Sequence, residues 1–201
     1  HIVGLKLGLQ TTELLDGLAR QQRMRSQRAE HIAAQLARLG YKDSYAGALQ
    51  LANGSGLGRP HFARYLVEAG AVSNFQQAFK RYLAAGKPAY VRAEWANIEQ
   101  VCGWIAAAGG VAVLAHPLKY KMTLTKLRSL LVAFKEVGGD GIEVISGAQR
   151  PEQTRSMAAL ARQFELQASI GSDFHQPGQP WAALGRIAAL PVDCIPVWSS
   201  W

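Results

Sequence analysis

Residues 109–117 read Gly-Gly-Val-Ala-Val-Leu-Ala-His-Pro, an apolar run that ends abruptly at His116 and the proline after it. A short apolar run bounded by glycines and a proline predicts a buried strand. A second phrase of the same design is Gly171-Ser172-Asp173-Phe174-His175. Asp173 and His175 are two residues apart, so on an extended backbone both side chains project from one face and can bind one ion. Ligand residues at the ends of parallel strands are typical of barrel-type metalloenzymes.

The length and composition are those of an ordinary globular domain. The chain has 201 residues, of which 49% are hydrophobic, enough for a substantial core. No window approaches about 18 consecutive apolar residues, so no membrane span is expected. Cys102 and Cys194 form neither a disulfide framework nor a zinc motif. We therefore expect buried, reduced thiols and a cytoplasmic protein.

The charge is unbalanced towards the basic side. Lysine and arginine number 22 against 14 aspartate and glutamate, which gives a net charge of +8. This excess favours an anionic partner such as a phosphorylated metabolite or a nucleic acid. Five arginines crowd one long helical stretch: Arg20, Arg23, Arg25, Arg28 and Arg38. The alternative for such a run is a solvated helix face.

The hydrophobic pattern divides the chain into an α/β part and a helical part. Apolar spacing at threes and fours predicts helices at 11–39, 43–53, 60–69, 74–84, 98–108, 123–137 and 151–164. Short apolar runs predict strands at 2–8, 111–115, 141–145 and 167–170. We expect residues 29–90 to form a helical insertion, or cap, in a domain made of 1–28 and 91–201. The alternation of strands and helices in that domain predicts a parallel sheet with crossover helices.

The motifs together resemble one enzyme family. Leu114-Ala115-His116-Pro117 and Gly171–His175 resemble the third and fourth motifs of the PHP (polymerase and histidinol phosphatase) family of metal-dependent phosphoesterases. His1-Ile2-Val3-Gly4-Leu5 resembles the strand in which that family places another ligand histidine. Gly58-Arg59-Pro60-His61-Phe62-Ala63-Arg64 is similar to the Arg-x-His-Phe-Ala-Arg signature of one branch. That branch contains the nucleoside 3′,5′-bisphosphate phosphatases and the 5′-to-3′ exoribonuclease called RNase AM. Further similarities lie at 80–87 and 141–144.

The resemblance implies a distorted (β/α)7 TIM-like barrel with an inserted helical subdomain. It implies that His1, His116, Asp173 and His175 are metal ligands, and that His116, Asp173 and His175 form the catalytic centre. The ions would be Mn²⁺ first, with Zn²⁺, Fe²⁺ or Mg²⁺ as alternatives, and up to three of them; imidazole and carboxylate together suit such metals. The family takes further ligands from N-terminal His-x-His and Thr-Asp-His motifs and from an Asp and a Glu, none of which is present. We therefore expect the N-terminal strands of the barrel to be missing and the chain alone to be inactive.

Separate cations are needed to bind the rest of a substrate. Divalent ions lower the pKa of water and neutralise the charge on a phosphoryl group, whereas a second phosphate or an RNA chain needs donors away from the metals. Arg59, His61 and Arg64 fit this role, with Lys119 at the rim of the site. The structural alternative for the first three is helix capping and salt bridging. Glu143 is expected either to support a ligand histidine or to be an ordinary buried acid.

The expected function is hydrolysis of phosphate esters of nucleotides by a metal-activated hydroxide. The substrates would be nucleoside 3′,5′-bisphosphates or 5′-phosphorylated short RNA, and neither a membrane nor an obligate protein partner is implied. A histidinol-phosphate phosphatase is a second candidate, which the Arg-x-His-Phe-Ala-Arg insertion disfavours. A third is a non-catalytic nucleic-acid-binding domain that uses the helix from Arg20 to Arg38. The intact visible ligands disfavour it.

Overall fold

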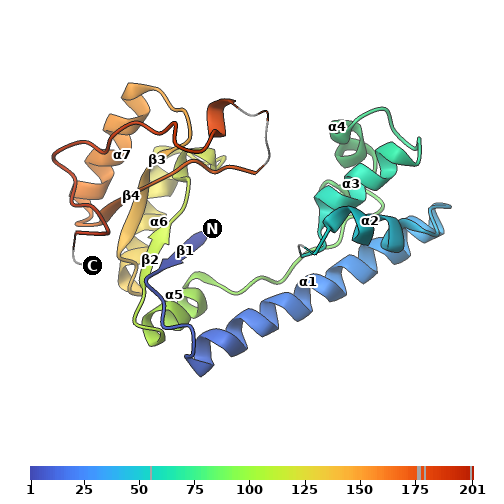
Figure 1. Ribbon diagram of the computed structural model, residues 1–201, viewed down its shortest axis with the longest axis horizontal. Coiled ribbons are helices and arrows are strands. Elements are labelled where there is room, and N and C mark those ends of the chain that lie inside the picture. The colour runs from blue at the N-terminus through green and yellow to red at the C-terminus, as the bar shows by residue number, and fades with distance from the viewer. Residues whose placement is uncertain (55, 176–177, 179, 200) are drawn as a thin grey trace. The chain divides into compact units, whose positions relative to one another are not determined.

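The chain forms two compact units. The computed structural model describes residues 1–201 except 55, 176–177, 179 and 200 (Figure 1). Unit 1 consists of His1–Leu15 and Asn97–Trp201, and unit 2 of Asp16–Ala96. The helical insertion predicted at 29–90 lies within unit 2. None of the described helices is long and apolar enough to cross a membrane.

Unit 1 is built on a four-stranded sheet in the order β1-β2-β3-β4. The strands are β1 (Ile2–Leu5), β2 (Val111–Leu114), β3 (Gly141–Ser146) and β4 (Gln167–Gly171). The parallel sheet is confirmed for β2, β3 and β4, but β1 pairs antiparallel with β2. β1 also ends three residues before the predicted boundary, because Lys6 adopts a left-handed backbone with φ of 53°, which a strand cannot continue.

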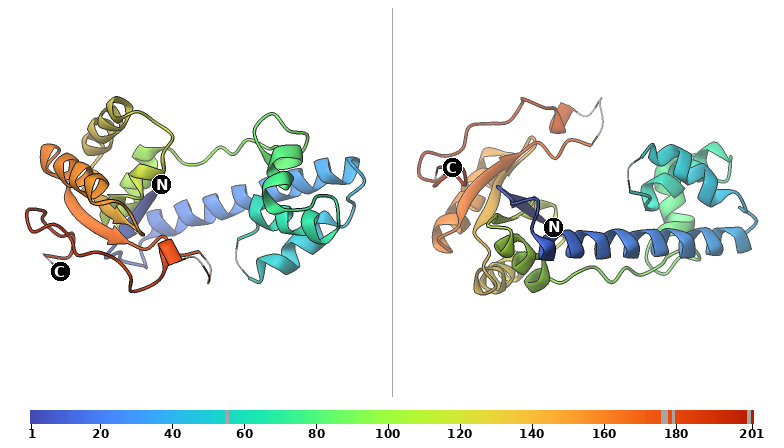
Figure 2. Two further views of the ribbon diagram at one scale, coloured as in Figure 1. Left: turned by 90° about the horizontal axis from the view of Figure 1, so that it is seen from above. Right: turned by 60° about the horizontal axis from the view of Figure 1, so that its bottom comes forward.

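Three helices pack against this sheet. They are α5 (Ile98–Ala107), α6 (Leu124–Glu136) and α7 (Pro151–Gln163), and their apolar faces share one buried core with the strands (Figure 2). The start of α5 is set by a capping box: the Asn97 side chain accepts the Gln100 N–H at 2.8 Å, and the Gln100 side chain accepts the Asn97 N–H at 3.1 Å. The α/β class predicted from the sequence is thus confirmed.

All regular secondary structure among the described residues of unit 2 is helical. It contains α1 (Thr12–Arg38, whose first turn lies in unit 1), α2 (Ser44–Ala52), α3 (Arg59–Glu68), α4 (Phe75–Ala78) and a π-helical turn (Phe79–Leu83). The helix predicted at 74–84 is therefore divided. The Ala84 N–H bonds to the Phe79 carbonyl five residues earlier, at 2.9 Å, and this spacing is the mark of a π-helix. Large apolar side chains that are fully buried form its core: Ile32, Leu36, Phe62, Leu66 and Leu83.

Candidate active site

The edge of the sheet where the parallel strands end carries the predicted ligands of unit 1. His116 lies just beyond β2, and Asp173 just beyond β4. β1 runs the opposite way, with Ile2 opposite Leu114, so its first residue also lies at this edge. The Ala115 N–H bonds to the His1 carbonyl at 3.1 Å and continues the ladder by one step. The carboxyl ends of parallel strands are where α/β enzymes place their sites.

His1 and His116 form a close pair of imidazoles. His1 Nδ1 lies 3.0 Å from His116 Nε2, and the ring planes are 81° apart. The other ring nitrogen of His116, Nδ1, is buried and has no hydrogen-bond partner in the described part of the chain. A buried nitrogen without a partner is costly. Two nitrogens that bind one octahedral ion at ~2.1 Å, with a right angle between them, lie ~3 Å apart. The facing nitrogens therefore lie at a distance that suits either an imidazole–imidazole hydrogen bond or two ligands of one ion.

Glu143 supports the backbone of His116. Its Oε2 accepts the His116 N–H at 2.5 Å. Burial raises the pKa of Glu143, and the nearby charge of Asp173 adds to this, although the His116 N–H acts in the opposite direction. A Cβ added at Gly171 would overlap Glu143 Oε1, so a side chain there would displace this carboxyl. Glu143 therefore contacts a predicted ligand histidine, as the first of the two roles expected for it requires.

Asp173 is ion-paired through its side chain and contacts a neighbouring histidine through its backbone. Its Oδ2 forms an ion pair with the Lys119 ammonium group, and its carbonyl contacts His175 Nδ1 at 2.7 Å. Partial burial acts to raise the pKa of Asp173, but the hydrogen bond and charge of Lys119 outweigh it and hold the pKa below its usual value. The carboxylate is thus ionised and already binds a positive charge, as a metal ligand must.

Two of the predicted ligands adopt left-handed backbone conformations. The φ angle is 35° at His116 and 53° at Asp173. Non-glycine residues rarely adopt this region, and such strain gathers at functional sites. In both places the chain turns sharply as it leaves a strand, which sets the direction of the side chain.

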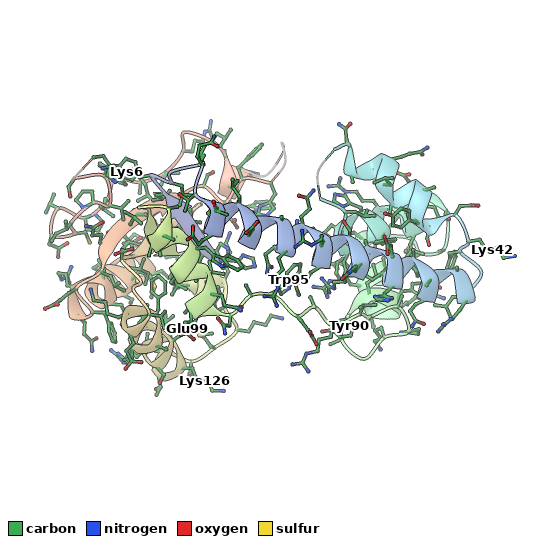
Figure 3. All side chains as sticks on the ribbon, turned by 90° about the horizontal axis from the view of Figure 1, so that it is seen from below. Lys6, Lys42, Tyr90, Trp95, Glu99 and Lys126 are labelled. Carbon is green, nitrogen blue, oxygen red and sulfur yellow. The ribbon has the colours of Figure 1, made fainter. Side chains whose placement is uncertain are left out.

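Arg59 in unit 2 is held by aromatic rings. Its guanidinium lies over the rings of Phe79 and Tyr90, at 5.8 and 5.9 Å from their centroids, and Tyr90 is labelled in Figure 3. Its Nη1 contacts the Leu83 carbonyl at 3.5 Å. Arginine on an aromatic face keeps its charge while losing little freedom. The arginine that begins the signature is therefore fixed in place.

His61 caps the helix on which it lies. Its Nδ1 accepts the Gly58 N–H at 3.1 Å. Burial lowers the pKa of His61, and the charge of Arg64 lowers it further. Burial and the charges of Arg59 and Arg25 likewise lower the pKa of Arg28. The cations of unit 2 therefore lie close enough together to repel one another.

Known proteins are similar in sequence over almost the whole chain, although no protein-family model matches it. The chain is 46% identical over 198 residues to a 5′-3′ exoribonuclease of Haemophilus influenzae, covering 98% of this chain and 72% of that protein. It is 40% identical over 199 residues to a 3′,5′-nucleoside bisphosphate phosphatase of Chromobacterium violaceum, covering 98% and 70%.

The chain belongs to the PHP phosphoesterases.

Solved structures agree with this placement in the PHP phosphoesterases. An amidohydrolase from Chromobacterium violaceum, with bound sulfate and no metal, matches with a TM-score of 0.85 at 40% identity, covering 98% of this chain and 69% of that one. A proposed metal-dependent phosphoesterase from Bifidobacterium adolescentis matches with a TM-score of 0.73 at 25% identity, covering 98% and 68%.

The PHP ligands predicted for this chain lie in two pairs. One pair is His1 with His116, and the other is Asp173 with His175, which Lys119 joins. Among the residues that the structure describes, no three His, Cys, Asp or Glu side chains converge on one metal position. The predicted substrate-binding residues Arg59, His61 and Arg64 belong to unit 2, whereas the predicted metal ligands belong to unit 1.

Sequence reasoning missed Tyr120 at this PHP site. Its hydroxyl donates to the Ala115 carbonyl at 2.7 Å, and its ring lies edge-on to the His116 ring at 5.8 Å. Burial, with the charge of Glu143, raises the pKa of Tyr120 to about 12, so it stays a neutral donor. Its position four residues after His116 was the only available signal, and that spacing alone does not predict a contact.

Proposed function

We propose that the chain is a metal-dependent phosphoesterase that hydrolyses phosphate esters of nucleotides. Nucleoside 3′,5′-bisphosphates and 5′-phosphorylated short RNA are its substrates. One observation carries the proposal: a histidine pair and an ionised Asp173 lie at one edge of a sheet, in a chain with relatives named as exoribonuclease and nucleoside bisphosphate phosphatase. These relatives favour nucleotides over histidinol phosphate.

The metal ligands in this proposal are His1, His116, Asp173 and His175. The 3.0 Å distance between His1 Nδ1 and His116 Nε2 and the ionised Asp173 support this set, and Mn²⁺ suits imidazole and carboxylate donors. Divalent ions, when bound, supply an activated water near neutral pH and neutralise charge on the phosphoryl oxygens.

The remaining site residues orient a ligand histidine or bind the phosphates of the substrate. Glu143 holds the His116 backbone through its 2.5 Å hydrogen bond, so that the imidazole keeps its direction. Lys119 supplies a positive charge at the rim, where it can contact a phosphate. Arg59, His61 and Arg64 bind a second phosphate of the substrate, because arginine matches the paired oxygens of that group.

The proposal extends to the fold and the compartment. In this proposal the strands β1 to β4 are part of a distorted TIM-like barrel, as membership of the PHP family implies. Cys102 and Cys194 are free and buried, which suits a reducing compartment such as the cytoplasm.

The test compares two ion-paired aspartates of unit 1. Asp173 pairs with Lys119, and Asp193 pairs with Arg162 at 2.5 Å. The protein used is a version extended to the length of the relatives. In it, D173N should remove bound Mn²⁺ and lower the rate of phosphate release from a nucleoside 3′,5′-bisphosphate. The loss should exceed the roughly 100-fold that is typical when a residue hydrogen-bonded to a metal ligand is changed. D193N should leave both unchanged.

The same assay separates the alternatives. Hydrolysis of histidinol phosphate in preference to both nucleotide substrates would reassign the enzyme. Failure of the unmodified protein to hydrolyse a bisphosphate or a 5′-phosphorylated RNA, with RNA still bound by D173N, would favour a binding module.

A further inference from the structure

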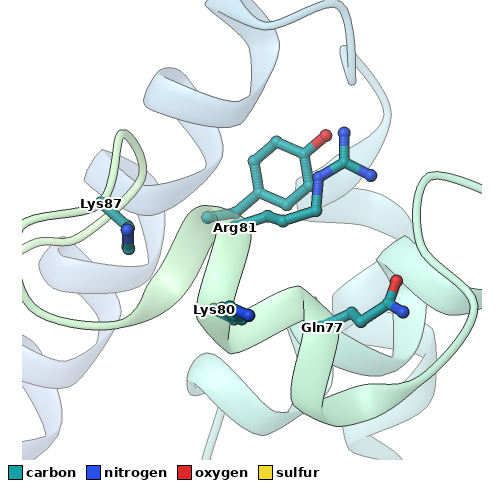
Figure 4. Close-up of a pocket in the computed structure, with 5 residues that line it drawn as sticks. Gln77, Lys80, Arg81 and Lys87 are labelled. Carbon is teal, nitrogen blue, oxygen red and sulfur yellow. The ribbon is translucent and has the colours of Figure 1, made fainter.

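A basic pocket in unit 2 has no role in the reaction as described so far. It has a volume of about 530 Å³ and is lined by Gln77, Lys80, Arg81, Tyr82 and Lys87 (Figure 4). Three of these five side chains are cationic, and none is acidic. A pocket of this size and charge suits an anion the size of a nucleotide.

The chain builds this pocket from a π-helical turn and the loop after it. Lys80, Arg81 and Tyr82 lie on the turn Phe79–Leu83. Gly86, with φ of 76°, reverses the chain. The loop is then closed by the Ala89 N–H, which bonds to the Tyr82 carbonyl at 2.9 Å, and this brings Lys87 back beside the turn. Isolated π-helical turns frequently mark functional sites.

The cations of the pocket differ in how firmly they are held. Arg81 donates to the Ala71 carbonyl at 3.2 Å and lies over the Tyr82 ring, and the Tyr82 hydroxyl bonds to that of Tyr41 at 2.9 Å. Arg81 is thus fixed. Lys80 and Lys87 are exposed, and their ammonium groups form no hydrogen bond or ion pair within the described residues. Both lysines are therefore available to a ligand.

The charge of the whole chain is concentrated around this pocket's unit. Unit 2 contains twelve lysines and arginines against five aspartates and glutamates, so it carries +7 of the net +8. The same turn also holds the signature arginine, because Arg59 contacts the Leu83 carbonyl and lies over Phe79. The pocket and Arg59 thus share one structural element.

We propose that this pocket binds backbone phosphates of single-stranded RNA, one at each of its two exposed lysines. The proposal rests on the proposed function and names its substrate class: oligoribonucleotides bind more tightly than mononucleotides. RNA is favoured over other polyanions because the chain is similar to a 5′-3′ exoribonuclease.

The experiment measures binding rather than cleavage. A labelled 5′-phosphorylated RNA of ten nucleotides, with phosphorothioate linkages that resist hydrolysis, is titrated with protein at several salt concentrations. K80Q/K87Q should raise its Kd about tenfold at low salt and reduce the slope of log K against log salt by about 1.4, which corresponds to two phosphate contacts on a single strand. The matched control R20Q/K42Q removes two charges of unit 2 outside the pocket and should change neither; Lys42 is labelled in Figure 3.

Two further ligands complete the test. The Kd of a nucleoside 3′,5′-bisphosphate should change less than twofold in K80Q/K87Q, and inorganic phosphate should compete with the RNA only weakly. An equal loss for the bisphosphate would assign the pocket to the phosphates of a mononucleotide and overturn the proposal. So would an equal or larger loss of RNA binding in R20Q/K42Q, or none in K80Q/K87Q. Because no turnover is measured, these outcomes are independent of whether the phosphoesterase activity is found.

Discussion

In unit 1 the candidate ligands lie on sharp backbone turns at the ends of strands, whereas in unit 2 the cations lie on helices and are held by aromatic side chains. His116 and Asp173 take left-handed backbone conformations, while Arg59 and Arg81 lie over aromatic rings. Chemistry at an ion needs donor atoms placed to a fraction of an ångström, and the backbone can fix them so closely. Binding of a flexible polyanion tolerates looser placement, which side-chain stacking provides.

The charge follows the same division. Unit 1 contains ten basic and nine acidic side chains, so it is almost neutral, whereas unit 2 has twelve against five. Opposite charges in unit 1 are used in pairs such as Lys119 with Asp173. In unit 2 the net positive charge raises the local concentration of anions. The proposed metal ligands therefore lie in the nearly neutral unit, and most of the proposed substrate-binding cations lie in the basic one.

The largest expected effect tests whether the units are separate in stability. Phe62 in unit 2 and Phe134 in unit 1 are both 0% exposed, and each change to alanine should lower the free energy of unfolding by about 3–5 kcal/mol. F62A should unfold unit 2 first. Thiol labelling reports on unit 1 alone, because both cysteines lie there, and burial together with the charge of Asp140 raises the pKa of Cys102 to about 11, so its thiol is unreactive until unit 1 unfolds.

Circular dichroism follows the loss of helix in the same samples. F62A should shift the loss of helix well before Cys102 labelling, and F134A should advance the labelling. A single shared transition in both variants would show that the two units unfold together.

A smaller effect is expected at the backbone of the metal site. G171A places a methyl group against Glu143, which should displace the carboxyl from the His116 N–H and weaken Mn²⁺ binding by about 10–100-fold. The control is G103A in α5, where the added Cβ meets no atom within 4 Å and should add up to about 1 kcal/mol of helix stability. Calorimetric titration with Mn²⁺ measures the metal affinity of the two variants. Equal affinities in the two variants would show that Glu143 does not orient His116.

The smallest expected effect is a pH dependence of the free energy of unfolding of unit 2. The native pKa of His61 is lowered from 6.5 by burial and by Arg64, so below pH 6.5 the unfolded chain binds more protons than the native one. The stability that depends on neutral His61 is therefore complete above pH 6.5 and is lost as the pH falls towards the lower native pKa. Protonation also removes the Nδ1 acceptor from the Gly58 N–H.

Urea unfolding of unit 2 between pH 7.5 and 5 measures this dependence. H61Q should flatten the profile, and H31Q, on the exposed face of α1, should keep it. A profile that H31Q flattens as much as H61Q would place the titrating group elsewhere.

The sequence was sufficient for the elements that depend on local pattern. Apolar runs and caps located the four strands and most helices within a few residues, and the abrupt end of each run before His116 and Asp173 located the edge where both residues lie. The direction of β1 could not be predicted, because it depends on pairing with a strand more than a hundred residues later in the chain. The π-helical turn at Phe79–Leu83 was also missed, since its pattern is that of an α-helix.

The finer geometry of the site lies outside what a sequence encodes locally. The ion pair of Lys119 with Asp173 joins residues 54 positions apart, and the need for Gly171 comes from the Glu143 carboxyl on the neighbouring strand. The stacking of Arg59 depends on rings that later segments bring to it. Each is a product of tertiary packing, for which no periodicity exists.

The pairing of β1 with β2 has a consequence for the insertion of unit 2. Leu5 lies opposite Val111, and the Gly8 N–H bonds to the Ala108 carbonyl at 2.8 Å, so the long excursion through unit 2 departs and returns at neighbouring points. A tight hairpin of a few residues would span the same gap. The helical unit is therefore inserted between two adjacent strands, and a change in its length would leave the strand order and the edge bearing His116 in place.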